Sequence, residues 1–109
     1  MPSTISKDQP VVTLINTFTV APERQEELVQ LLIEATEKVM KHLPGFVSAN
    51  IHRGLDGRHV ANYAQWRSQE DFDAMLRNPE AQAHMRPIAE MAQFDPVLYV
   101  VADDITRDR

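Results

Sequence analysis

A chain of 109 residues is long enough for one domain with one hydrophobic core. Its composition, 43% hydrophobic and 25% charged, is that of a globular protein, and a net charge of −5 without a basic run argues against a nucleic-acid partner. Cysteine is absent, which excludes disulfides, thiolate metal sites and a cysteine nucleophile. No apolar stretch is long enough for a membrane span and the start lacks the apolar core of a signal peptide, so we expect a cytoplasmic protein with no membrane partner.

The first half of the chain predicts an arm, a strand and a helix. Residues 1–10 are polar and end in proline, so we expect a flexible N-terminal arm. Residues 11–20 are rich in β-branched side chains and predict a strand, whose alternation puts Asn16 and Phe18 on one face. Residues 22–45 predict a helix, because Pro and Glu residues open it, Lys and His residues follow near its end, and Pro-Gly stops it.

Two alternating runs, 46–53 and 58–66, predict a β-hairpin closed by the loop GLDG. A four-residue loop would place Ala49 opposite Asn62, which leaves space beside this polar side chain. Alternation then gives one face to cover with helices: Val47, Ala49, Ile51, Val60, Asn62, Ala64 and Trp66. Phe46, Tyr63 and Gln65 fall on the opposite face.

The second half predicts two more helical segments and a strand. Ser68 followed by Asp71 resembles a capping box and opens a helix over 68–76. Asn78-Pro79 interrupts it, and residues 79–92 continue as a helix. Residues 94–105 predict the last strand, and 106–109 a frayed tail.

The resulting order, β-α-β-β-α-β, is typical of the ferredoxin-like α+β fold within one domain, 11–105. Its four-stranded antiparallel sheet carries both helical segments on one face. The other face would expose Ile15, Phe46 and Tyr63, which is more apolar surface than a monomer usually leaves in water. We therefore expect a homodimer in which two sheets pack face to face, as a dimeric α/β barrel.

Four segments carry a resemblance to a known family. They are LINTFTVAPERQEEL, LPGFVSANIHRGLDG, VANYAQWRSQEDFDAM and FDPVLYVV, in this order and spacing. Over residues 11–101 the chain resembles the antibiotic biosynthesis monooxygenase family of small dimeric proteins. Within it, NYAQW is most similar to the cofactor-independent enzymes that oxidise anthrones to quinones in aromatic polyketide pathways.

The resemblance implies particular functional residues. The asparagine, tryptophan and arginine of the anthrone-oxidising enzymes fall on Asn62, Trp66 and Arg86. Their active-site tyrosine falls on Phe72, which lacks the hydroxyl group.

A second branch of the family degrades haem and provides the main alternative. Its strand asparagine and its iron-ligating histidine fall on Asn16 and His84, but its tryptophan falls on Met75. A third hypothesis is a non-catalytic dimeric module that binds a hydrophobic ligand.

The leading hypothesis is a monooxygenase that uses O2 on an electron-rich aromatic substrate. No phosphate loop, metal cluster or haem-attachment motif is present, so no metal and no cofactor is expected. Asn62 would bind a ring oxygen, Trp66 would offer a ring face and an N–H, Arg86 would stabilise negative charge and His84 would carry a proton. The substrate pocket is expected to include Asn16, Phe18, Phe72, Met75 and Met85.

Each candidate also has a purely structural interpretation. Asn62 or Asn16 could bond a neighbouring backbone group, Trp66 could be core, and Arg86 could be a solvated surface residue. His84 follows Ala81 by three residues, so it points toward the core side and is more typical of a partly buried structural histidine.

Overall fold

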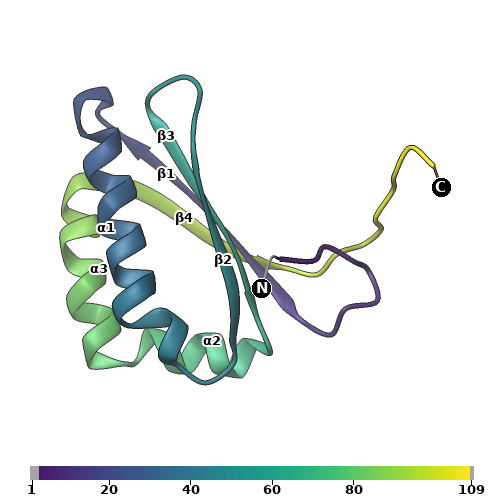
Figure 1. Ribbon diagram of the computed structural model, residues 1–109. Helices are drawn as coiled ribbons and strands as arrows, with labels where there is room; N and C mark the ends of the chain where they lie inside the picture. Colours follow the sequence, from purple (N-terminus) through teal and green to yellow (C-terminus); the bar gives the residue numbers. More distant parts are fainter. Residues whose placement is uncertain (1–2, 109) are drawn as a thin grey trace.

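The computed structural model describes residues 3–108, and within them a four-stranded antiparallel sheet carries all the helices on one face (Figure 1). The strands are β1 (Val12–Val20), β2 (Phe46–Arg53), β3 (His59–Trp66) and β4 (Ala92–Tyr99), in the sheet order β2-β3-β1-β4. The helices are α1 (Gln25–Lys38), α2 (Gln69–Leu76) and α3 (Pro79–Met91), with 3-10 turns at Pro22–Arg24 and Met40–His42. The ferredoxin-like prediction is confirmed. No helix in this range is long and apolar enough to cross a membrane.

The central strands β1 and β3 form the floor of the helix-covered side. β1 pairs with β3 so that Leu14 faces Ala64 and Asn16 faces Asn62. On its other side β1 pairs with the edge strand β4, where Asn16 faces Pro96. Proline has no backbone N–H to donate, and it is tolerated there because an edge strand forms hydrogen bonds with a neighbouring strand on one side only.

Side-chain caps begin the helices α2 and α3. The hydroxyl of Ser68 accepts a hydrogen bond from the Asp71 N–H at 3.1 Å and caps α2. The Asn78 side chain accepts one from the Ala81 N–H at 3.0 Å and caps α3. Together these two caps turn the chain from α2 directly into α3. Pro87 lies inside α3.

Two hydrophobic clusters fill the space between the helices and the sheet. The first packs around Trp66 and joins β1, β3, α2 and the start of α3: Leu14, Val39, Ala64, Trp66, Phe72, Met75 and Ala81. The second packs α1 and α3 on the opposite end of the sheet: Phe18, Val20, Leu28, Val29, Leu32, Val60 and Ile88. Between them lie Asn16 and Asn62, which belong to neither cluster.

The hairpin register differs from the predicted one by two residues. Ile51, not Ala49, lies opposite Asn62, and the Gly54 N–H bonds the His59 carbonyl oxygen at 2.7 Å. The loop is longer because an Asp56 carboxylate oxygen accepts from the N–H groups of residues 58 and 59, at 3.0 and 3.2 Å. An even shift keeps the side chains of residues 48–53 and 60–66 on their predicted faces.

A β-bulge corrects the predicted faces at the start of β2. Phe46 pairs with Trp66 and Ser48 with Gln65, so Val47 is an extra residue on the β2 side. Phe46 therefore lies beside Trp66 on the helix-covered side, with ring centroids 5.5 Å apart, while Val47 is 45% exposed. The prediction had exchanged these two residues.

Two predicted boundaries were also too wide. The last strand ends at Tyr99 rather than at residue 105, because its pairing with β1 ends where Thr13 faces Tyr99, near the start of β1. The first helix is α-helical only over Gln25–Lys38, and 3-10 turns take up both of its predicted ends.

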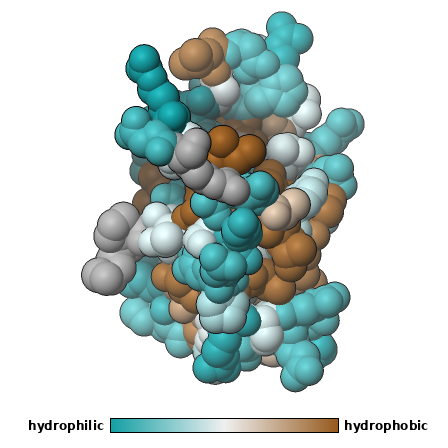
Figure 2. All heavy atoms as spheres, turned by 90° about the vertical axis from the view of Figure 1, so that its right-hand side faces the viewer, coloured by the Kyte–Doolittle hydropathy of each residue, from teal (hydrophilic) through white to brown (hydrophobic). Residues whose placement is uncertain are grey.

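The face of the sheet without helices is partly covered by the N-terminal segment. The Gln65 side chain, 1% exposed, donates to the Thr4 carbonyl oxygen at 2.6 Å and accepts from the Ser48 hydroxyl at 3.1 Å. Lys7 binds the chain after β4 through its N–H and the Asp104 carboxylate, 2.8 Å. Figure 2 looks onto this side and shows hydrophobic surface between hydrophilic residues. Val97 and Tyr99 remain 38% and 46% exposed there.

Candidate functional site

A cavity of about 460 Å³ lies between the helix-covered side of the sheet and the three helices. Its wall is mainly apolar: Leu14, Phe18, Leu32, Ala35, Met40, Phe46, Ala49, Ala64, Trp66, Phe72, Met75, Met85 and Ile88. Exposed members of the lining, among them Leu76, Arg86 and Phe94, lie on α2, α3 and β4. The cavity therefore opens between these three elements. Its size and apolar wall suit a flat, small organic molecule.

Two asparagine side chains form the polar part of the cavity floor. Asn16 and Asn62 are direct partners across β1 and β3, where Cβ atoms are about 5 Å apart. The Oδ1 atoms of both are buried and accept no hydrogen bond from any residue within 3–108. A buried carbonyl oxygen without a donor costs about 1–3 kcal/mol. The structural interpretation, in which each asparagine bonds a neighbouring backbone group, therefore does not hold for these two oxygens.

Trp66 forms an aromatic wall with two neighbours. Its ring meets Phe46 at 88° and Phe72 at 77°, with centroid separations of 5.5 and 6.1 Å. Edge-to-face contacts of this kind fix the indole ring. The indole N–H makes no hydrogen bond to another described residue, although the side chain is only 2% exposed. Trp66 is thus both a core residue and part of the cavity wall.

Arg86 is the charged residue in the lining. One side of α3 faces the cavity at Gln82, Met85, Arg86 and Ala89, which are three and four residues apart. The Gln82 side chain donates to the Leu76 carbonyl oxygen at 3.0 Å and ties α3 to the end of α2. Arg86 forms no ion pair with a described residue and is exposed.

Most of the residues predicted from the sequence come together here. The cavity lining contains Asn16, Phe18, Asn62, Trp66, Phe72, Met75, Met85 and Arg86. His84 is not among the lining residues, and its Nδ1 lies 3.1 Å from the Glu80 carbonyl oxygen one turn back on α3. An imidazole that ligates haem in this cavity would have to be part of its lining, so the position of His84 does not favour the haem alternative.

Sequence reasoning missed several lining residues. Met40 lies in the 3-10 turn after α1, Gln82 lies on α3, and Phe94 and Pro96 lie on β4. The period of α3 could have found Gln82, since it precedes Arg86 by four residues. Phe46 was missed because the bulge that turns it inward leaves no mark in the alternation.

The charged groups with shifted pKa values lie outside the cavity, in ion pairs on the surface. Glu26 accepts hydrogen bonds from Arg53 at 2.7 and 2.9 Å, which lowers the pKa of this carboxyl to about 2. Within 3–108 no group of three or more His, Asp or Glu residues could hold a metal ion.

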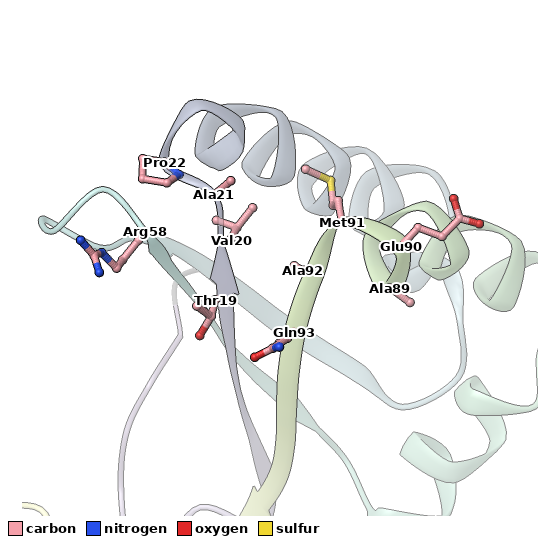
Figure 3. Close-up of a pocket in the computed structure, with 10 residues that line it drawn as sticks. All are labelled: Thr19, Val20, Ala21, Pro22, Arg58, Ala89, Glu90, Met91, Ala92 and Gln93. Carbon is pink, nitrogen blue, oxygen red and sulfur yellow. The ribbon is translucent and has the colours of Figure 1, made fainter.

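A second hollow lies where β1 ends and β4 begins (Figure 3). Its lining includes Arg58 and Glu90, and Figure 3 shows the Glu90 carboxylate on the far side of the hollow from Arg58. It holds no buried polar group without a partner. Unlike the first cavity, this hollow therefore offers a ligand no buried polar atom in need of a partner.

The chain is similar to known monooxygenases. The family model described as antibiotic biosynthesis monooxygenase matches residues 11–87. Tetracenomycin-F1 monooxygenase of Streptomyces glaucescens is 45% identical over 95 residues, which are 87% of this chain and 85% of that protein.

Two solved structures show the same fold. The monooxygenase ActVA-Orf6 of Streptomyces coelicolor, in complex with nanaomycin D, has a TM-score of 0.81 and 25% identity over 92% of this chain and 96% of that one. SnoaB of Streptomyces nogalater, a cofactor-independent oxygenase, has a TM-score of 0.72 and 24% identity over 93% of this chain and all of that one.

Proposed function

This chain belongs to the antibiotic biosynthesis monooxygenase family, and we propose that it oxidises an electron-rich aromatic substrate of the anthrone or quinol type with O2 and no prosthetic group. That the protein is a monooxygenase follows from its relatives. The observation that carries the finer proposal is the pair Asn16 and Asn62, two unpartnered amides on the floor of an otherwise apolar cavity.

An anthrone can supply all the electrons that this reaction needs. Loss of a proton from its CH2 group gives a carbanion, which can pass one electron to O2 and then combine with the reduced oxygen as a peroxide. Loss of water from the peroxide leaves a C=O group, so one oxygen atom enters the product and the other leaves as water. The protein then has to bind the ring system, favour its anion and limit the access of water.

The cavity residues match these tasks. The Asn62 amide can donate to a ring oxygen of the substrate and stabilise the anion delocalised onto it, and Asn16 stands directly opposite. Trp66 offers an N–H and, with Phe46 and Phe72, a wall for the aromatic rings. Phe72 has no hydroxyl group, so it contributes shape and not a proton.

Oxygen uptake with the anthrone dithranol tests this proposal against a blank without protein. We expect uptake without added flavin or metal, and a decrease of about a hundredfold in kcat/KM for Asn62→Ala. Gln30→Ala removes an amide from the exposed side of α1 and should leave the rate unchanged. Equal rates for the wild type and Asn62→Ala would contradict the assigned site.

We also propose that the uncovered face of the sheet binds a second copy of the chain. Val97 and Tyr99 are exposed on this face, beside the partly buried Ile15. Light scattering should give twice the monomer mass for the wild type and a lower mass for Val97→Glu. A monomeric wild type would overturn this assembly without affecting the cavity.

A further inference from the structure

Three methionines from three different elements line the cavity. Met40 lies in the 3-10 turn after α1, Met75 on α2 and Met85 on α3. Met75 belongs to the hydrophobic cluster around Trp66, and Met40 and Met85 pack against this cluster. An aromatic ring system bound beside Trp66 would therefore lie among thioether side chains.

Met91 provides a comparison within the same chain. It ends α3, packs against the second hydrophobic cluster and lines the other hollow, where Figure 3 shows its thioether. Met91 is partly buried, whereas Met75 is only 6% exposed. An oxidant dissolved in water attacks the more accessible thioether, so by itself it should oxidise Met91 at least as fast as Met75.

The thioethers of the lining bring a chemical property into an apolar wall. Methionine is flexible and fills irregular spaces, which accounts for its use in such a wall. Its sulfur is also a nucleophile that peroxides oxidise to a sulfoxide. Cysteine is absent, so thioethers are the only sulfur groups of the protein. The reaction proposed above forms a hydroperoxide on the bound ring system, and confinement in one cavity raises the effective concentration of the two groups toward each other.

We propose that Met40, Met75 and Met85 are modification sites, which accept an oxygen atom from the substrate hydroperoxide in a fraction of turnovers. The inference rests on the function proposed above and adds a side reaction to it. A sulfur lone pair attacks the outer oxygen, the O–O bond breaks, and the proton of the hydroperoxide moves to the inner oxygen. Sulfur is oxidised by two electrons to the sulfoxide, and the hydroperoxide is reduced to an alcohol on the ring. No further oxidant or reductant is needed.

This side reaction would limit the number of turnovers that one molecule performs. A sulfoxide replaces an apolar thioether by a polar group and disrupts an apolar wall. The activity should therefore decline with the number of turnovers completed, and not with the time spent in buffer. Methionine sulfoxide reductases can convert the sulfoxide back to the thioether, so the modification is reversible.

Mass spectrometry of the protein after turnover of dithranol under ¹⁸O2 tests the proposal. Catalase in the reaction removes free hydrogen peroxide, and a second sample is treated with hydrogen peroxide alone to measure oxidation by a dissolved oxidant. The readout is the sulfoxide summed over the three lining methionines relative to that at Met91. This ratio should be at least about tenfold higher after turnover than after peroxide treatment. The sulfoxide should carry ¹⁸O, and one molecule of hydroxyanthrone should form for each sulfoxide.

Leucine variants separate the lining from the rest of the chain, because leucine nearly conserves the volume of methionine. The double variant Met75→Leu/Met85→Leu should complete about threefold more turnovers before half of its activity is lost, since two of three acceptors are removed. Met91→Leu is the matched control and should leave both the initial rate and the number of turnovers unchanged.

Two outcomes distinguish a failure of this inference from a failure of the proposed function. Oxygen uptake with dithranol and the same sulfoxide ratio as in the peroxide sample would overturn the inference and leave the oxidation intact. Without uptake the proposed oxidation fails, and cumene hydroperoxide, an aromatic hydroperoxide that needs no turnover, then tests the acceptors alone. A ratio about tenfold above that of hydrogen peroxide would support the three methionines as acceptors, and an equal ratio would contradict them.

Discussion

Asn16 and Asn62 lie directly opposite each other on β1 and β3, and the carbonyl oxygens of both side chains are buried without a donor from the described residues. On the other face of the sheet the buried side chains of Gln65 and Ser48 bond each other, whereas the buried Thr13 hydroxyl also has no partner among the described residues. A ligand whose hydroxyl groups donate to the two asparagine oxygens can recover the free energy lost at this pair. The pair therefore connects the stability of the protein with its activity.

Replacement of either asparagine by leucine should stabilise the folded protein and reduce its activity. Asn62→Leu removes an unsatisfied carbonyl group at nearly constant volume, so we expect a gain of about 1 kcal/mol, or roughly 4–8 °C in Tm for a domain of this size. Calorimetry of the ligand-free protein measures the change. A lower Tm in both Asn16→Leu and Asn62→Leu would mean that the oxygens are satisfied in solution.

Trp66→Phe should affect stability and turnover together. Loss of part of the buried ring leaves space between Phe46 and Phe72, at a cost of about 1–2 kcal/mol. Loss of the N–H removes one donor from the cavity and should lower kcat about tenfold. Urea unfolding and oxygen uptake measure the two effects. Full activity in a folded Trp66→Phe protein would show that the indole is only a core residue.

Gly45 directly precedes Phe46 of the aromatic wall and has a backbone conformation that favours glycine. It has φ of +85°, and a Cβ atom there would collide with the Asp71 side chain. Gly45→Ala should therefore destabilise the protein by more than about 1 kcal/mol and disturb Phe46, the next residue. Gly57→Ala is the matched control, since Gly57 has φ of +80° and open space around it. Equal decreases in Tm in the two variants would mean that backbone strain alone causes the loss of stability, and would contradict a collision with Asp71.

The pair of Glu26 and Arg53 gives the protein a defined response to acid. Because the folded-state pKa of Glu26 is lowered to about 2 from 4.5, its contribution is present above pH 4.5 and is lost as pH falls toward 2. NMR titration of the Glu26 carboxyl should show this low midpoint. In Arg53→Met, which removes the donor, the midpoint should move up toward 4.5. An unchanged midpoint in this variant would assign the shift to another group.

The sequence was sufficient for the parts of the fold that depend on local signals. The caps at Ser68 and Asn78, the buried side of α1 and the alternation of β1 and β3 all follow from residue type and period. The same alternation placed Asn62 and Trp66 on the helix-covered face, and the resemblance to the family indicated Arg86.

Other features depend on tertiary structure that periodicity does not encode. The bulge at Val47 turns Phe46 into the cavity, and the Asp56 side chain lengthens the hairpin loop. The direct pairing of Asn16 with Asn62 requires the register between β1 and β3, two strands that the helix α1 and the strand β2 separate in the chain. The spacing along α3 indicated His84 as well as Met85 for the cavity side, but only Met85 is among the lining residues, because the two are adjacent and project about 100° apart around the helix.

The most direct test of the central claim is oxidation of dithranol under ¹⁸O2, with the quinone product analysed at once by mass spectrometry. The account predicts product formed faster than in the blank, with one ¹⁸O atom in the newly formed carbonyl group, and a much lower rate for Asn62→Ala. Enzymatic product without the label, or a rate no higher than the blank, would contradict a monooxygenase reaction of an anthrone in this cavity.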